Sequence, residues 1–556
     1  MKFKYLLATI LISLLSYKGE SQINVGIESN SQYYTKDNKI ELSDSAKEDP
    51  LRSNNYIKIN YLKDYFEVGL QAEGYVPKAL LNYNPELDGI GIGTVYARYN
   101  NYNKGVDITL GHFYEQFGSG LALRSWEDRA LGINNAIFGG RFKVRLHPST
   151  NLTVLGGKQR IGMGFDLSDG FIYGANAEVD ITNLLGNDNY LLKFGTSFVG
   201  RREDITKEYP TIDPNTNVIS TRLEYAGEKF SIGGEYLYKT EDAIMDNFAG
   251  VNSLYPERSR KGNGFLVNMG YTTDGFAANV SLRRLENMTF YSNRQLGGNA
   301  YNMGMINYLP ALTKQYDFAL QNIFVYQAQP KYGYMTIPKL GEIGGQFDIF
   351  YDIPKNTFLG GDFGANLIVN GSYWAGLKVE NESDDNLRST GFLDFGTKYY
   401  RDIAVEYRRK WSNKFSTIFM YLNQYYNKEY VEETYDQIHS DVAVAEGLYF
   451  FKPTSSLRLE LQHQWADGDR KNWAGGTIEF MPNSTFSFFV HDIYNYGNDD
   501  SEMRLHYYNL GGSFTKGATR VALAYGRQRG GLVCVGGVCR MVPEATGFTL
   551  NVTTNF

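Results

Sequence analysis

Apolar and polar residues alternate along almost the whole of this chain. In its last segment, GFTLNVTTNF, Phe548, Leu550 and Val552 share one parity with the final residue, Phe556. The same period of two recurs in LRLELQHQW (457–465) and in FAANVSLRR (276–284). Because a β-strand points successive side chains to opposite faces, each such segment has one apolar and one polar face. The pattern predicts an all-β protein built from one sheet, or from two packed sheets.

Composition agrees with strands and excludes a helical membrane protein. The chain has 44 Tyr, 34 Phe and 59 Gly but only 14 Pro, a composition that favours strands. After residue 15 no apolar run approaches the roughly 20 residues that a membrane helix needs, and mean hydropathy is −0.38.

The connections between the alternating segments are alternately short and long. Long polar connections include 77–90, 117–135, 241–261 and 290–340. Short turns at one rim and long loops at the other are typical of outer-membrane barrels. We therefore expect a single transmembrane antiparallel β-barrel of about 24 strands, with short periplasmic turns and long extracellular loops; the alternative is a soluble β-solenoid or a large sandwich. The short turns are expected near Asp64, Asn103, Ser149, Asn187, Glu228, Asp274, Lys355, Asn413, Thr454, Asn483 and Lys516.

The N-terminal segment predicts export. Lys2 and Lys4 precede an apolar run from Tyr5 to Leu15, and small residues follow at Gly19 and Ser21. This is the pattern of a signal peptide, so residues 1–21 are expected to be removed and 22–556 to form the barrel; the alternative is a buried N-terminal helix. The expected location is the cell outer membrane. No globular plug domain fits between residue 22 and the first expected strand.

The two faces of the strands predict two environments. The expected lipid-facing residues are Leu457, Leu459, Leu461, Phe276, Val280, Leu282, Phe548, Leu550 and Val552. The opposite parity is expected to face the lumen and to set the selectivity of a channel; it comprises Asn279, Arg283, Arg458, Glu460, Gln462 and Gln464.

The two stretches HFYEQFGSGLALRSWEDRALGINNAIFGGR (112–141) and RGGLVCVGGVCRMVPEATGFTL (529–550) resemble an uncharacterised family of Bacteroidetes-type outer-membrane barrels. The resemblance covers essentially the whole of residues 22–556. That family has no assigned activity, so the resemblance implies fold and location, not chemistry.

The only cysteines, Cys534 and Cys539, flank Gly536-Gly537. Exported thiols pair in an oxidising compartment, and a reversal at the glycines would bring the two Cβ atoms together. A structural disulfide in the last extracellular loop is therefore predicted. A redox or metal site is the alternative, although it needs more ligands than two thiols.

Two loop segments have further patterns. Arg124, Trp126, Glu127, Asp128 and Arg129 form a charged cluster that predicts an ion-paired lid or a loop folded into a constriction; paired carboxylates near arginine also occur in acid–base catalysis. In the longest connection, Pro310, Leu312, Tyr316, Leu320 and Phe324 have helical spacing. A helix of about four turns from Pro310 to Phe324, plugging or gating the barrel, is predicted; a strand is the alternative.

These observations predict a non-enzymatic, porin-like channel without a cofactor or a metal, gated by folded-in loops. The alternatives are a scaffold barrel of an assembly or secretion complex and an outer-membrane hydrolase. Expected partners are outer-membrane lipid and lipopolysaccharide, periplasmic chaperones and the barrel-assembly machinery, to which the terminal Phe556 would be a signal, and possible further outer-membrane proteins. The net charge of −6 argues against nucleic acid. Acidic segments at 380–385 and 498–502 are expected to be solvated loop tips, or to bridge lipopolysaccharide through divalent cations.

Overall fold

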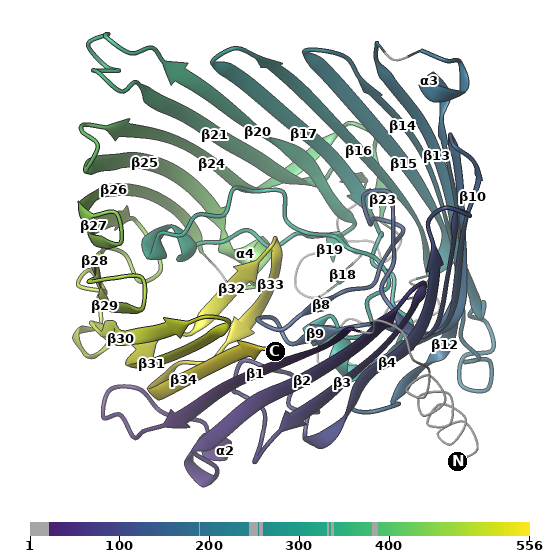
Figure 1. Ribbon diagram of the computed structural model, residues 1–556, viewed down its shortest axis with the longest axis horizontal. Helices are drawn as coiled ribbons and strands as arrows, with labels where there is room; N and C mark the ends of the chain where they lie inside the picture. The colour runs from purple at the N-terminus through teal and green to yellow at the C-terminus, as the bar shows by residue number, and fades with distance from the viewer. Residues whose placement is uncertain are drawn as a thin grey trace.

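The computed structural model shows one antiparallel sheet of 24 strands that closes into a barrel (Figure 1). It describes residues 22–187, 189–243, 254, 259–330, 333–334, 338–380, 387–434 and 436–556. The expected signal peptide, 1–21, and most of the acidic segment 380–385 lie outside this part of the chain. Each barrel strand pairs with its neighbours in sequence, so the predicted fold class and strand number are confirmed.

The barrel strands are mostly 10 or more residues long. They are β1 (Gln22–Tyr34), β2 (Leu51–Lys63), β3 (Phe66–Tyr75), β4 (Gly89–Asn101), β5 (Val106–Phe113), β10 (Ile137–His147), β11 (Thr150–Arg160), β12 (Leu167–Asp180), β13 (Leu191–Arg202), β14 (Asn215–Ala226), β15 (Phe230–Asp242), β16 (Arg260–Thr273), β17 (Phe276–Glu286), β20 (Gly341–Ile353), β21 (Ala365–Leu377), β24 (Phe395–Lys410), β25 (Phe415–Asn427), β26 (Gln437–Lys452), β27 (Ser455–Ala466), β28 (Trp473–Met481), β29 (Phe486–Tyr494), β30 (His506–Lys516), β31 (Thr519–Gln528) and β34 (Ala545–Asn555).

The first and last strands close the ring. β1 pairs with β34 from Gly26 opposite Asn555 to Tyr34 opposite Gly547. Beyond this ladder, the backbone N–H of Phe556 donates to the carbonyl of Val25 at 2.8 Å, and the N–H of Val25 donates back at 3.1 Å. The pairing leaves neither of these two strands with an open edge, which is what a sheet in lipid requires.

Short turns and long loops lie at opposite rims, as predicted. β2 and β3 meet at Asp64, which has a φ of 52°, and β16 and β17 meet at Gly275, which has a φ of 70°. The N-terminal end of β1 lies at this same rim, because Gln22 pairs with Leu62 close to the Asp64 turn. Long connections such as 35–50, 287–340 and 529–544 leave the other rim.

The strand faces follow the predicted parity. Leu459 and Leu461 are 46% and 58% exposed, whereas Glu460 between them is 2% exposed. Leu282, Phe548 and Leu550 are also exposed. An apolar outer band beside buried polar inner residues is the arrangement of a transmembrane barrel. No helix in the described ranges is long and apolar enough to cross a membrane.

Smaller elements lie in the connections. Several of them, including β8, β9, β18, β19, β32 and β33, lie inside the ring (Figure 1). The two-stranded pairs are β6 (Gln116–Phe117) with β7 (Leu123–Arg124), β8 (Glu127–Asp128) with β9 (Ile133–Asn134), β18 (Gly333–Tyr334) with β19 (Pro338–Lys339), β22 (Val379–Glu380) with β23 (Arg388–Ser389), and β32 (Gly531–Val535) with β33 (Val538–Val542). The short helices are α2 (Asp44–Glu48), α3 (Ile181–Leu184), α4 (Lys428–Val431), η3 (Gly297–Tyr301), η4 (Ala319–Asn322) and η5 (Ser501–Met503).

The predicted helix from Pro310 to Phe324 is wrong. The segment is irregular apart from the 3₁₀ turn η4, and the alternative strand is not formed there either. Its backbone finds partners outside itself: the N–H of Ala311 donates to Gly537, that of Leu320 to Gln462, and the carbonyl of Leu312 accepts from the Trp374 indole. The apolar residues Leu312, Tyr316, Leu320 and Phe324 pack in one cluster with the inner wall. Helical spacing is therefore not needed to bury them.

Candidate functional site

Three connections fold back into the lumen (Figure 1). They are the loop 114–136 between β5 and β10, the loop 287–340 between β17 and β20, and the hairpin 531–542 formed by β32 and β33. Two clusters of buried apolar residues join the loops to the wall. One packs Leu320, Phe324 and Tyr326 against wall residues such as Ile438, and the other packs Phe117 and Leu309 against wall residues. The folded-in loops and the inner wall of the barrel thus form an apolar core inside the ring.

Two of the six residues predicted to face the lumen, Gln462 and Arg283, help to hold these loops. Gln462 accepts a hydrogen bond from the backbone N–H of Leu320 at 2.9 Å. Arg283 contacts Glu342 at 2.6 Å, and Glu342 in turn accepts from the hydroxyl of Tyr326 at 2.5 Å. Burial and the Glu342 carboxylate raise the pKa of Tyr326 well above its usual value, so its hydroxyl stays protonated and keeps donating.

The remaining predicted lumen residues form wall contacts or line a hollow. Arg458 bridges Glu446 at 2.8 Å and Glu479 at 3.1 Å, and it also contacts Glu460. Gln464 is fully buried, and Asn279 lines a cavity beside Pro310 and Gly537. Their proposed role in selectivity stays a prediction.

The charged cluster at 124–129 belongs to the folded-in loop 114–136. Arg129 contacts Glu28 of β1 at 2.5 Å and Glu127 at 3.4 Å. Glu127 accepts from Gln71 of β3 at 2.6 Å. The Arg124 guanidinium lies 5.1 Å from the ring centroid of Trp126, and Asp128 accepts from the N–H of Leu131. The cluster is thus ion-paired and tied to the wall; whether it forms a constriction stays a prediction.

The predicted disulfide between Cys534 and Cys539 is confirmed. It crosses the hairpin 531–542, with Gly536 and Gly537 at the tip in left-handed conformations (φ of 56° and 81°). The tip meets the loop 287–340, since the Tyr308 hydroxyl donates to the Gly536 carbonyl at 2.5 Å. On the other strand, Arg540 donates to the carbonyl of Ala130 at 2.9 Å. Burial lowers the pKa of Arg540.

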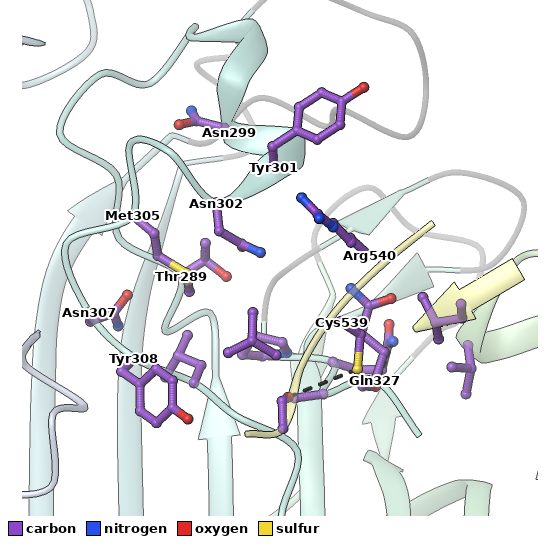
Figure 2. A pocket seen from close by; sticks show the side chains of 18 of the residues that line it. Thr289, Asn299, Tyr301, Asn302, Met305, Asn307, Tyr308, Gln327, Cys539 and Arg540 are labelled. Carbon is purple, nitrogen blue, oxygen red and sulfur yellow. Dashed lines mark hydrogen bonds between the residues drawn. The ribbon is translucent and has the colours of Figure 1, made fainter. Parts of the chain in front are cut away.

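A cavity of about 310 Å³ lies between these segments (Figure 2). Its wall comes from the loop 287–340 on one side and from the hairpin 531–542 on the other, with Trp126 from loop 114–136 and Glu433 just beyond α4. The polar and aromatic lining residues are Trp126, Thr289, Tyr291, Asn299, Tyr301, Asn302, Asn307, Tyr308, Gln327, Gln329, Lys339, Glu433 and Arg540. Such a mixture can bind a small polar molecule.

Sequence reasoning did not identify this cavity. Its amide and phenol groups come from segments 291–308 and 327–329, which are predicted to be loop because they lack periodicity. The only signal was the density of Asn, Gln and Tyr in those segments. In the described part of the chain, no group of three or more His, Cys, Asp or Glu is arranged to hold a metal ion.

Comparisons with known proteins give a family and several barrels. The model of a family of unknown function, DUF6029, matches residues 1–556. No curated protein sequence matches the chain. The translocation pore of the P pilus usher (PapC) is 8% identical, with a TM-score of 0.41, over 96% of this chain and 99% of that chain. The siderophore receptor PirA from Pseudomonas aeruginosa is 8% identical, with a TM-score of 0.39, over 97% and 81%. OccAB3 from Acinetobacter baumannii is 9% identical, with a TM-score of 0.33, over 97% and 99%. Similarities this low say nothing about what the present chain binds or transports.

Proposed function

The chain belongs to the family of unknown function DUF6029, and from its lumen we propose that it is an outer-membrane channel closed at rest by its own loops. In this proposal the loop 287–340 is the fixed part of the plug and the hairpin 531–542 is the movable part. The barrel is non-enzymatic, and lipid, lipopolysaccharide and the barrel-assembly machinery are its partners. Residues 1–21 direct its export.

One observation carries the proposal: the hairpin 531–542 is bordered by space. The cavity of about 310 Å³ touches it along Val538–Met541, another of about 450 Å³ lies at its tip, and a third of about 380 Å³ separates Val533 from the wall. A segment packed at interior density would leave few voids larger than a water molecule. The hairpin therefore has space beside it into which it can shift.

Besides the buried side chains of Leu532, Cys539 and Val542, a few hydrogen bonds hold the hairpin. They include Tyr308 to the Gly536 carbonyl, Ala311 to the Gly537 carbonyl at 2.8 Å, and Arg540 to the carbonyls of loop 114–136. Each neutral hydrogen bond contributes only about 0.5–1.5 kcal/mol net, and each one from a charged group about 1.5–3 kcal/mol. A closed state held by a few such bonds can exchange with an open one on the timescale of loop motions.

The loop 287–340, by contrast, is anchored at several points. Arg294 contacts Glu203, just beyond β13, and Asp242 of β15 at 2.9 Å each, with all three side chains almost fully buried. Leu320 and Phe324 join the large apolar cluster. Moving this loop would expose both the ions and the apolar surface, which explains why we assign movement to the hairpin.

The charged groups around the cavity give no support to a catalytic reading. Lys339 and Glu433 lie 3.7 Å apart as an ion pair, and Arg540 is engaged with backbone carbonyls. A general base needs an accessible group next to a reacting atom. Lys339 and Arg540 are engaged within the protein, and Glu433 contacts Lys339 through Oε1, while its Oε2 has no hydrogen bond in the described ranges.

Single-channel recording tests the proposal. The purified chain, refolded into a planar bilayer, should show rare and small openings. Replacing residues 532–541 by a short Gly-Ser linker should give a large, steady conductance, because the cavities on the two sides of the hairpin would merge. The matched control shortens the turn at 354–364 on the opposite rim, which should leave the recordings unchanged.

The apolar packing of the loop 287–340 favours a second candidate, a permanently closed scaffold barrel for other outer-membrane components. A correctly folded hairpin deletion that stays electrically silent would support that candidate and reject the channel. Co-purification of fixed partners in mild detergent would then be expected.

A further inference from the structure

Three polar side chains at the cavity are candidates for binding a ligand. Tyr301 and Asn302 lie at the end of η3, and Gln327 lies on the returning part of the same loop (Figure 2). Within the described ranges, no residue forms a hydrogen bond with the Tyr301 hydroxyl or with the side-chain amides of Asn302 and Gln327. By comparison, Gln329 nearby accepts from Lys339 at 3.2 Å. The three free groups can both donate and accept.

The charged side chains that line the cavity already have partners within the protein. We therefore expect that a ligand need not be charged to bind there. Lys339 is paired with Glu433, and Arg540 donates to the carbonyls of Ala130 and Leu131. A charged ligand would have to compete with one of these arrangements, which is costly for charges that leave water. A neutral ligand avoids this cost.

Apolar and aromatic side chains also line the cavity. Trp126 and Tyr308 stand edge to face with ring centroids 5.4 Å apart, and Leu309 and Met541 add aliphatic surface. Ligand pockets combine such surface with a few orienting polar groups. A ligand that is complementary to this lining has C–H faces to contact the aromatic rings and hydroxyls to bond to the polar groups.

From these contacts we propose that the cavity binds a neutral, polyhydroxylated solute of the size of a mono- or disaccharide. Its hydroxyls bond to Tyr301, Asn302 and Gln327, and its C–H faces lie on the aromatic rings. The volume of about 310 Å³ is at the lower end of the roughly 300–1,000 Å³ of ligand pockets. The role of this site rests on the proposed function: a solute that contacts the hairpin 531–542 lies where a solute transported by the channel would pass.

Calorimetric titration of the folded chain in detergent tests this binding. The probes are glucose and maltose as neutral saccharides, glucuronate as a charged analogue, and glycylglycine as a neutral peptide. The saccharides should bind. Gln327→Leu, which keeps the side-chain volume, and Asn302→Gly, which keeps the left-handed backbone (φ of 60°), should each weaken binding roughly three- to tenfold through the loss of a hydrogen bond.

Gln116→Leu is the matched control, because it makes the same change at an exposed position of loop 114–136; it should leave the affinity unchanged. Binding of glucuronate alone, of glycylglycine alone, or of no probe overturns the proposal, as does unchanged affinity in both cavity variants with unaltered unfolding curves. Binding without conductance in the hairpin deletion would reject only the channel. Conductance without binding would reject only the saccharide site.

Discussion

Single carboxylates fix the loops of this barrel at defined points. Glu342 accepts from Arg283, from the hydroxyl of Tyr326 and from the backbone N–H of Gln329 at 2.7 Å. Asp37, in the loop 35–50, accepts from Nε and Nη2 of Arg527 at 2.8 Å each and from the Thr546 hydroxyl at 2.7 Å. Each links a loop to the wall through charge-assisted bonds, which are about twice as strong as neutral ones.

The contact of Asp37 with Arg527 and Thr546 is expected to weaken in acid. Partial burial alone would raise its pKa, but the hydrogen bonds from Arg527, Thr546 and the Lys39 N–H lower it below the usual value. A carboxyl with a lowered folded-state pKa stabilises the fold fully above its unfolded pKa, and this contribution is lost as pH falls through the folded value. Asp37→Asn should therefore cost about 1.5–3 kcal/mol of unfolding free energy at pH 7, and less in acid.

Urea unfolding in lipid vesicles at neutral and at acidic pH measures this effect. Asp499→Asn, at an exposed loop position whose partner is the surface Lys471, is the control. A pH-independent difference between Asp37→Asn and the original chain would contradict the assignment.

Some residue-level predictions from sequence succeed because they depend on local geometry. The Cys534–Cys539 bridge follows from two glycines between two cysteines. The lumen position of Gln462 follows from strand parity. That its carbonyl would hold Leu320 does not follow, since 142 residues separate them. Contacts over such distances depend on where each loop enters the lumen, which periodicity does not encode.

Among the elements, the strands carry the lipid face. Leu459→Arg should lower the unfolding free energy by about 2–4 kcal/mol, if it lies near the bilayer midplane, because a guanidinium is costly in hydrocarbon. Asn279→Arg, on the inner face beside a cavity, should cost far less. Folding yield in vesicles and urea titration measure both. Equal losses would mean that the two faces are wrongly assigned.

The loop 287–340 depends on its buried ions. Arg294→Met should leave Glu203 and the shared Asp242 without one cation and cost about 3–5 kcal/mol. The loop should then be cleaved faster by trypsin in folded protein. Arg504→Met, at an exposed position of the loop 495–505, is the control. Unchanged proteolysis in Arg294→Met would show that the apolar cluster alone fixes the loop.

Strands and loops differ in how far sequence determines them. A barrel strand has a lipid side and an inner side throughout, so its alternation reports its structure directly. The segment Pro310–Phe324 is surrounded by protein. Its apolar residues can therefore be buried whether the backbone is helical, extended or irregular. The failure of the helix prediction has this physical origin. The cavity could not be predicted for the same reason.

For the whole molecule, turn spacing sets the strand number. Each short turn joins two strands on one rim, so the predicted turns and the two terminal strands account for all 24 strands. The filling of the lumen is the part that the sequence does not specify, because it depends on the closed ring.

The disulfide should matter to permeability more than to stability. It closes a short loop, with a sequence separation of 5, so chain-entropy arguments give only about 2 kcal/mol. Replacing both cysteines by serine should leave the barrel folded but make openings more frequent in planar bilayers, since the hairpin 531–542 loses its rigidity. Wild-type protein treated with a reductant should reproduce the effect. Identical recordings in all three cases would remove the hairpin from the gating proposal.

The pairing of β1 with β34 also has a consequence in time. The loops 114–136 and 287–340 precede the last strand in the chain, and the hairpin 531–542 immediately precedes it. Once the first and last strands have paired, the wall is continuous. Bulky segments can then enter the lumen only through the rims. The interior is therefore expected to be packed while the ring is still open, with the hairpin arriving last. A misplaced loop would hold the two terminal strands apart. Closure of the ring should therefore occur only after the loops are correctly placed.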